Sequence, residues 1–116
     1  MEYKLLALDL DGTLLDENNQ ITEKNYEKLQ EIKQQGVRIV IATGRMMISA
    51  IQYTDKLKLK GPLITYNGAY IMDTDTDKIL FHEPVSIELT HEIIKDCKRE
   101  GIHLNLYQDD SLFVEE

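Results

Sequence analysis

Residues 5–13 read Leu-Leu-Ala-Leu-Asp-Leu-Asp-Gly-Thr, and this stretch decides the fold class. Its four leading apolar residues are too few for a helix and are typical of a buried strand in a parallel sheet. Polar residues then end the strand. Asp9 and Asp11 are two residues apart, so on an extended chain their side chains project to the same side. The stretch therefore predicts a strand whose carboxyl end presents two acids to one crevice.

Two similar strands follow, each after a helical segment. A helix is expected between Thr22, a good N-cap, and Gly36, a natural terminator, and a second helix over residues 46–58. The apolar runs 37–42 and 63–66 predict the second and third strands. This order predicts an α/β fold, a Rossmann-like parallel sheet with flanking helices and right-handed crossovers. Ligands in such sheets bind beyond the carboxyl ends of the strands.

The pattern changes after residue 68. Residues 69–72 and 79–82 flank a polar turn and predict a hairpin. Ser86 is a candidate cap for a helix that reaches Glu100, and alternating residues beyond it predict two further strands. We place a boundary near Pro84, which divides the chain into residues 1–84 and 85–116.

Composition excludes several classes of function. The 116 residues contain 13 Lys and Arg against 21 Asp and Glu, a net charge of −8, which argues against binding nucleic acid through its phosphates. The single Cys excludes an internal disulfide and fits a reducing compartment. No apolar run approaches the roughly 18–20 residues of a membrane span, and no signal peptide is visible. We therefore expect a cytoplasmic protein with no membrane or nucleic-acid partner.

The two acids after the first strand suit group-transfer chemistry. Carboxylates held close together repel, which raises one pKa and favours a division of labour between a nucleophile and a proton donor or acceptor. A divalent cation such as Mg²⁺ offsets the repulsion and binds carboxylates together with phosphate oxygens. Gly12 allows a sharp turn close to a ligand, and the Thr13 hydroxyl and nearby amides can cradle an anion.

The end of the second strand supplies a second anion-binding element. Thr43-Gly44-Arg45 lies at a strand-to-helix junction, where free amides and the positive end of the helix dipole favour phosphate. The Thr43 hydroxyl can donate to a phosphate oxygen. For Arg45 the alternative is a surface ion pair, and for Asn67-Gly68, after the third strand, the alternative is an ordinary turn.

These motifs resemble those of a known family. Residues 9–15 resemble motif I of the haloacid dehalogenase-like hydrolase superfamily (HAD), and residues 42–45 resemble its motif II in the Cof-type, subfamily IIB form. Residues 65–69 are similar to a further signature of that branch. The resemblance runs through the whole chain in order. It implies that residues 1–84 form the N-terminal half of the HAD core and that residues 85–116 begin an α+β type IIB cap domain.

The resemblance implies a Mg²⁺-dependent phosphatase that acts through an aspartyl-phosphate. Asp9 would be the nucleophile and a metal ligand, while Asp11 would be the general acid and base and bind the metal through its backbone carbonyl. Sugar phosphates and other small phosphorylated metabolites are the implied substrates. The candidate phosphate-binding residues, from the residues and the resemblance together, are Leu10, Gly12, Thr13, Thr43 and Gly44. The candidate substrate contacts are Arg45 and Asn67.

The family pattern continues beyond this chain. It adds the rest of the cap, a motif III lysine and a motif IV acidic cluster, so we expect residues 1–116 alone to bind Mg²⁺ weakly and to turn over little or no substrate. In the family's strand order the strand at residues 5–8 would then be an open sheet edge, which invites pairing with another chain. Two alternatives stay open: a non-catalytic fragment that self-associates or binds a partner through this edge, and a phosphomutase-type phosphotransferase.

Overall fold

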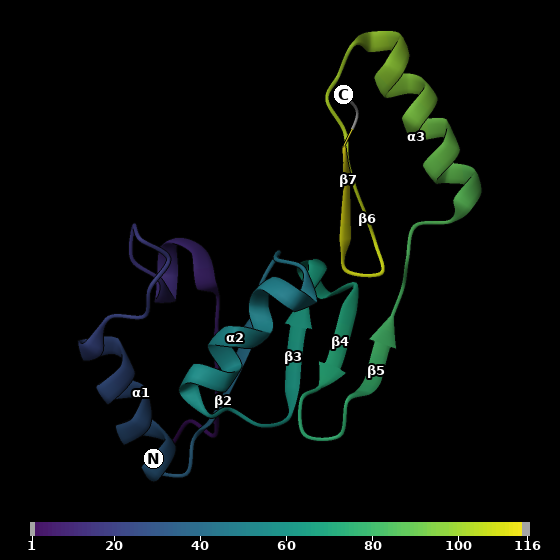
Figure 1. The fold of residues 1–116 in the computed structure, drawn as a ribbon. Coiled ribbons are helices and arrows are strands. Elements are labelled where there is room, and N and C mark those ends of the chain that lie inside the picture. Colours follow the sequence, from purple (N-terminus) through teal and green to yellow (C-terminus); the bar gives the residue numbers. More distant parts are fainter. Residues whose placement is uncertain (1, 115–116) are drawn as a thin grey trace. The chain divides into compact units, whose positions relative to one another are not determined.

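The computed structural model describes residues 2–114 (Figure 1). The chain divides into two compact units, residues 1–82 and 83–116. The helices and strands of the first unit are β1 (Leu5–Leu8), α1 (Glu23–Gln34), β2 (Arg38–Ala42), α2 (Met47–Leu57), β3 (Pro62–Thr65), β4 (Tyr70–Asp73) and β5 (Lys78–His82), with tight turns at η1 (Leu10–Leu14) and η2 (Tyr66–Gly68). Those of the second unit are α3 (Ile87–Glu100), β6 (Asn105–Gln108) and β7 (Ser111–Val114).

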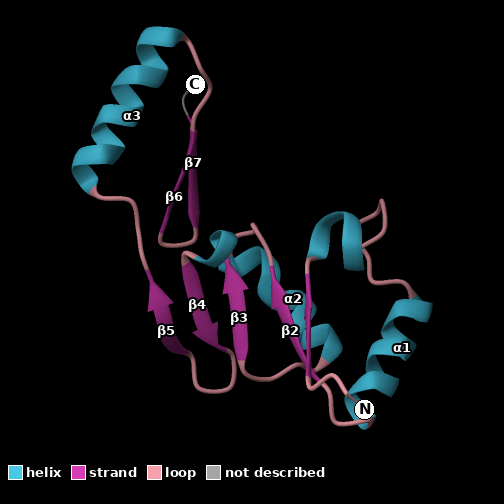
Figure 2. Cartoon of the chain, turned by 180° about the vertical axis from the view of Figure 1, so that it is seen from behind, coloured by secondary structure: helices cyan, strands magenta, loops and turns pink. Residues whose placement is uncertain are grey.

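A five-stranded sheet of order β1-β2-β3-β4-β5 forms the first unit (Figure 2). The first three strands are parallel, as predicted, and each is joined to the next through a helix. The hairpin of β4 and β5 extends the same sheet antiparallel to β3, so the sheet is mixed. The short links explain the change of direction, because a parallel return needs a crossover of about a dozen residues.

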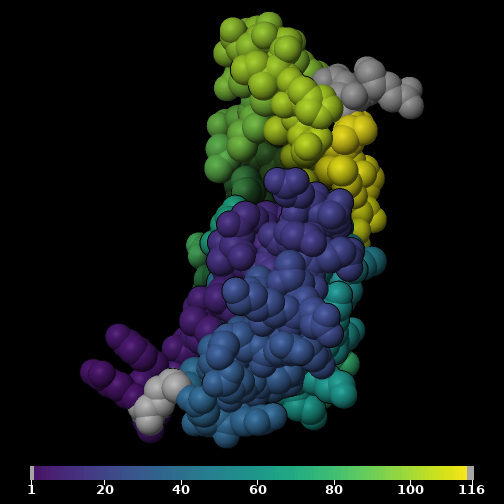
Figure 3. Space-filling model, turned by 90° about the vertical axis from the view of Figure 1, so that its left-hand side faces the viewer, coloured from purple at the N-terminus to yellow at the C-terminus, as the bar shows by residue number. Residues whose placement is uncertain are grey.

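Both helices of this unit pack on one face of the sheet. The predicted N-cap holds, since the Thr22 side chain accepts a hydrogen bond from the amide of Asn25. Apolar residues of α1 and α2 join those of β2 and β3 in one core. The core members that these four elements supply are Leu29, Ile39, Ile41, Met47, Ala50, Tyr53, Leu57 and Leu63. A space-filling view shows α1 and the loop before it, in blue and purple, covering one side of the unit (Figure 3).

The first strand is the open sheet edge that the family's strand order predicts, and not the buried strand that its apolar run alone predicts. β1 pairs only with β2 among the described residues and forms one edge of the sheet. Leu6 and Leu8 pack against the core, whereas Leu5 is 54% exposed. An apolar edge strand with unpaired backbone groups is a template for pairing with another strand.

We expect this edge to make the chain self-associate, and Leu5→Lys to weaken that association. A charged side chain on an edge strand disfavours strand pairing, and the exposed Leu5 side chain can change without emptying the core. Sedimentation equilibrium over a range of protein concentrations measures the effect. Ile48→Lys, at a 61% exposed apolar position on helix α2 and away from either sheet edge, is the matched control and should leave the association unchanged. A wild-type chain that stays monomeric at all concentrations contradicts the expectation.

The second unit consists of a capped helix and a hairpin. The Ser86 side chain accepts a hydrogen bond from the amide of Leu89, and Gly101 ends α3 in a left-handed conformation, as the sequence predicts. β6 and β7 pair antiparallel. None of the described residues of this unit is fully buried. Across residues 2–114, no helix combines the length and the apolar character that crossing a bilayer requires.

Candidate functional site

The carboxyl ends of β1, β2 and β3 surround a single pocket. Asp9 enters it directly after β1, Thr43 and Gly44 enter it after β2, and Asn67 enters it after β3. The complete lining is Asp9, Ala42, Thr43, Gly44, Ile64, Asn67 and Gly68. Four of the predicted site residues, Asp9, Thr43, Gly44 and Asn67, thus come together at the edge of the sheet where ligands of parallel α/β folds bind.

Thr43 is held rigidly in this pocket. It is buried, its amide donates to the carbonyl of Ile64 at 3.0 Å, and its carbonyl accepts from the amide of Asn67 at 3.1 Å. The Thr43 Oγ1 atom accepts from the amide of Arg45 at 3.1 Å. Since this contact uses a lone pair of the oxygen, the hydroxyl proton is available to donate to a ligand.

Asp9 lies in the pocket without a structural partner. Its side chain is exposed and makes no hydrogen bond or ion pair within residues 2–114. A carboxylate in this position is accessible both to a substrate and to a cation. No cluster of three or more His, Cys, Asp or Glu side chains that could hold a metal occurs among the described residues.

Asp11 is placed differently from the expectation that both acids share one crevice. Its carboxylate is not part of the pocket lining and instead receives a two-pronged hydrogen bond from Arg45. Arg45 Nε donates to Oδ2 at 2.7 Å and Arg45 Nη2 donates to Oδ1 at 2.5 Å. This planar fork is the strong form of an arginine–carboxylate contact. The extended strand ends before Asp11, since this residue already belongs to the turn Leu10–Leu14, so the alternation of side chains along a strand no longer applies to the two acids.

The fork sets the charge state of the pair. Hydrogen bonds from Arg45 hold the pKa of the Asp11 carboxyl below its usual value, and the same contact raises the pKa of the Arg45 guanidinium. The Asp11 side chain is 53% exposed and that of Arg45 is 20% exposed. Solvent therefore screens the interaction on the aspartate side.

Further partners anchor Arg45, and the sequence analysis did not identify them. Arg45 Nη2 donates to Asn19 Oδ1 at 3.0 Å, and Nη1 donates to the Tyr53 hydroxyl at 3.2 Å. The guanidinium carbon also lies 5.3 Å from the centre of the Tyr53 ring. One signal was available: Ser49, which contacts Nη1 at 3.5 Å, and Tyr53 follow Arg45 at spacings of four residues, which is one face of a helix. Arg45 thus lies among protein groups at the start of α2.

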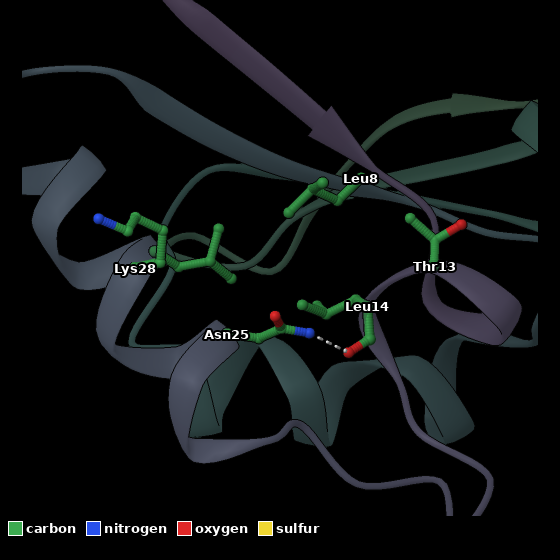
Figure 4. Close-up of a pocket in the computed structure, with 6 residues that line it drawn as sticks. Leu8, Thr13, Leu14, Asn25 and Lys28 are labelled. Atoms are coloured by element: carbon green, nitrogen blue, oxygen red, sulfur yellow. Dashed lines mark hydrogen bonds between the residues drawn. The ribbon is translucent and has the colours of Figure 1, made fainter.

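The remaining candidates of the first loop lie outside the Asp9 pocket. Leu10 is completely buried and does not line the pocket. Thr13 lines a second pocket, which lies between the loop after β1 and helix α1 (Figure 4). There it faces Leu8 and Leu14, and Asn25 Nδ2 donates to the Leu14 carbonyl at 3.2 Å.

The amino-acid sequence matches that of known proteins along almost its whole length. The sequence profile of haloacid dehalogenase-like hydrolases matches residues 6–116. This chain belongs to that family. Among curated HAD relatives, it is 30% identical to the pyridoxal phosphate phosphatase YbhA of Escherichia coli over 115 residues, which cover 99% of this chain and 42% of YbhA.

Solved HAD structures share the fold of the chain. A haloacid dehalogenase-like hydrolase from Bacteroides thetaiotaomicron superimposes with a TM-score of 0.85 at 26% identity, over 99% of this chain and 44% of that one. The HAD subclass IIB sugar phosphatase BT4131 superimposes with a TM-score of 0.81 at 26% identity, over 96% and 43% respectively. The chain therefore corresponds to less than half the length of these HAD proteins and matches their N-terminal part.

Proposed function

We propose that this chain carries the phosphoryl-transfer half of a HAD phosphatase that hydrolyses small phosphorylated metabolites through an aspartyl-phosphate. The observation that supports it is the shared pocket of Asp9, Thr43 and Gly44. The pocket holds a nucleophilic carboxylate, a hydroxyl donor and a glycine, all at the ends of neighbouring parallel strands. This combination suits the transfer of a phosphoryl group to a carboxylate.

In this proposal the reaction has two displacement steps. An Asp9 oxygen attacks phosphorus, the bond to the ester oxygen breaks, and the leaving oxygen takes a proton from Asp11. Water then attacks the phosphorus of the aspartyl-phosphate, the bond to Asp9 breaks, and Asp11 takes the proton of the water. The ionised Asp11 held by Arg45 is the form that accepts this second proton. Its role as an acid requires it to leave the fork.

The residues present fit a Mg²⁺ ion in part. The Asp9 carboxylate has no competing partner among the described residues, and hard oxygen ligands of this kind suit Mg²⁺, which keeps several waters and binds phosphate oxygens. Asp9 would hold the ion together with the Asp11 carbonyl, and the bound ion would neutralise charge on the phosphoryl group. The Asp11 carboxylate is occupied by Arg45 and is not assigned to the metal.

The substrate class rests on the relatives. YbhA is a pyridoxal phosphate phosphatase and BT4131 is a sugar phosphatase, both of which act on small phosphorylated molecules. The net charge of −8 also disfavours large polyanionic substrates such as nucleic acids. We therefore propose small phosphate monoesters as substrates of the complete site. Residues 85–116 would begin its cap domain, and residues 1–84 would form half of its core.

Acid-quench trapping tests the proposal. The chain is incubated with Mg²⁺ and a panel of acetyl phosphate, a sugar phosphate and pyridoxal phosphate, quenched in acid, and digested for mass spectrometry. We expect a phosphoryl group on the peptide that contains Asp9, and slow release of phosphate that depends on Mg²⁺. A phosphoryl group on a different residue, or none from any of these donors, contradicts the proposal.

A further inference from the structure

The turn after β3 has an unusual backbone. Three consecutive residues, Tyr66, Asn67 and Gly68, have positive φ angles of 50°, 55° and 95°. Left-handed conformations are disfavoured for residues with a Cβ, and tyrosine lacks the short polar side chain that makes asparagine and aspartate more tolerant of them. Backbone strain of this kind persists only where the surrounding structure holds it, and it concentrates at ligand sites.

The turn is tied to the loop that carries Thr43. The amide of Asn67 donates to the carbonyl of Thr43, and the amide of Tyr66 donates to the carbonyl of Arg45 at 3.0 Å. These two bonds fix the turn against the loop after β2 and place the Asn67 side chain beside Gly44. A Cβ added to Gly44 would lie 2.9 Å from Asn67 Oδ1. A side chain at position 44 would therefore displace the side-chain amide of Asn67 from its place beside Gly44.

The composition of the pocket then singles out Asn67. Among its seven lining residues, only Thr43 and Asn67 carry a hydrogen-bond donor in the side chain, and only in Asn67 is this donor an N–H group. The Asn67 side chain makes no hydrogen bond to the rest of the described chain. Arg45, which directly follows Gly44 in the sequence, is occupied by Asp11, Asn19 and Tyr53.

We propose that Asn67 binds the transferring phosphoryl group, with its side-chain amide donating to a phosphoryl oxygen opposite Thr43. This assignment rests on the proposed function. It means that a residue after β3 contributes to the phosphate site, beside those after β1 and β2. The left-handed turn then serves phosphate binding, since it directs the side-chain amide of Asn67 into the pocket rather than along β3. Gly44 leaves the room that this amide needs.

Asn67→Gly tests the assignment without disturbing the turn. Glycine adopts a φ of 55° more easily than asparagine does, so the substitution deletes the amide and leaves the backbone unstrained. Binding of inorganic phosphate in the presence of Mg²⁺ is followed by ¹H–¹⁵N NMR shifts at Gly44 and Thr43. We expect Asn67→Gly to bind phosphate at least about tenfold more weakly than the wild type, because a hydrogen bond to a charged group is lost.

Two further variants make the result decisive. Asn67→Asp keeps the size and the tolerance of a left-handed backbone but replaces the donor with a negative charge, so we expect still weaker phosphate binding. Asp77→Gly changes another exposed residue with a positive φ, in the turn between β4 and β5, and should bind phosphate at least as well as the wild type.

The outcomes separate this inference from the proposed function. Wild-type phosphate affinity in Asn67→Gly would show that Asn67 serves only the backbone and would overturn the inference, while the proposed function stands. A wild-type chain whose Gly44 and Thr43 signals do not respond to phosphate would overturn both.

Discussion

Replacing Asp9 with asparagine is expected to slow phosphoryl transfer by about a thousandfold or more. An amide oxygen is a poor nucleophile, and the proposed reaction has no other group that attacks phosphorus in its place. The same change should leave stability nearly untouched. The Asp9 side chain is exposed and makes no hydrogen bond or ion pair to the described residues, so its replacement breaks no bond that holds the fold. We expect a change in unfolding free energy within about 0.5 kcal/mol.

Two measurements on one variant check this expectation. Formation of the acid-stable phosphoryl peptide gives the rate of transfer, and urea unfolding gives the free energy. Asp77→Asn, at another exposed aspartate with no partner among the described residues, is the matched control and should transfer the phosphoryl group at the wild-type rate. Equal rates of phosphoryl transfer in Asp9→Asn and the wild type would show that Asp9 is not the nucleophile.

Replacing Arg45 with alanine is expected to reduce the stability of the fold. The guanidinium joins the loop after β1, through Asp11 and Asn19, to α2, through Tyr53. Its loss leaves these groups without their donor and removes the cation–π contact with the Tyr53 ring. Because Asp11 is half exposed, water replaces part of what is lost, and we expect a destabilisation of about 1–3 kcal/mol.

Arg45→Lys and Arg38→Ala define the cause of that loss. Lysine keeps the charge but cannot form the two-pronged contact, so it should restore only part of the stability. Arg38 begins β2, is exposed and makes no side-chain hydrogen bond to the described residues, so Arg38→Ala should cost less than about 0.5 kcal/mol. Urea unfolding measures all three variants. Full stability in Arg45→Lys would mean that charge alone, and not the fork, holds the loop.

The Asp11–Arg45 pair also predicts a dependence of stability on pH. The pKa of folded Asp11 lies below its unfolded value, so the pair stabilises the protein above the unfolded pKa and loses this contribution as the pH falls below about 4. Arg45→Ala removes the cause, and its unfolding free energy should fall less steeply between pH 5 and 2. An identical slope in both proteins contradicts this prediction.

Local sequence signals predicted most of the elements. Thr22 and Ser86 are caps whose side chains accept amide hydrogen bonds from within the first turn, which is a property of neighbouring residues alone. The apolar runs of β1, β2 and β3 and the motifs after them likewise lie within short windows. Asp9, Thr43 and Gly44 could be placed together because strands of parallel α/β units end at the same edge of the sheet.

The order of the elements, the parallel arrangement of the first three strands and the family motifs could thus be read from the amino-acid sequence. Three contacts became visible only in the folded chain: Asp11 meets Arg45, Thr13 lines a different pocket, and Asn67 lies against Gly44. The physical reason is the range of the interactions. Caps and strands depend on residues a few positions apart, whereas Asp11 and Arg45 are 34 residues apart and meet only after β1 has paired with β2.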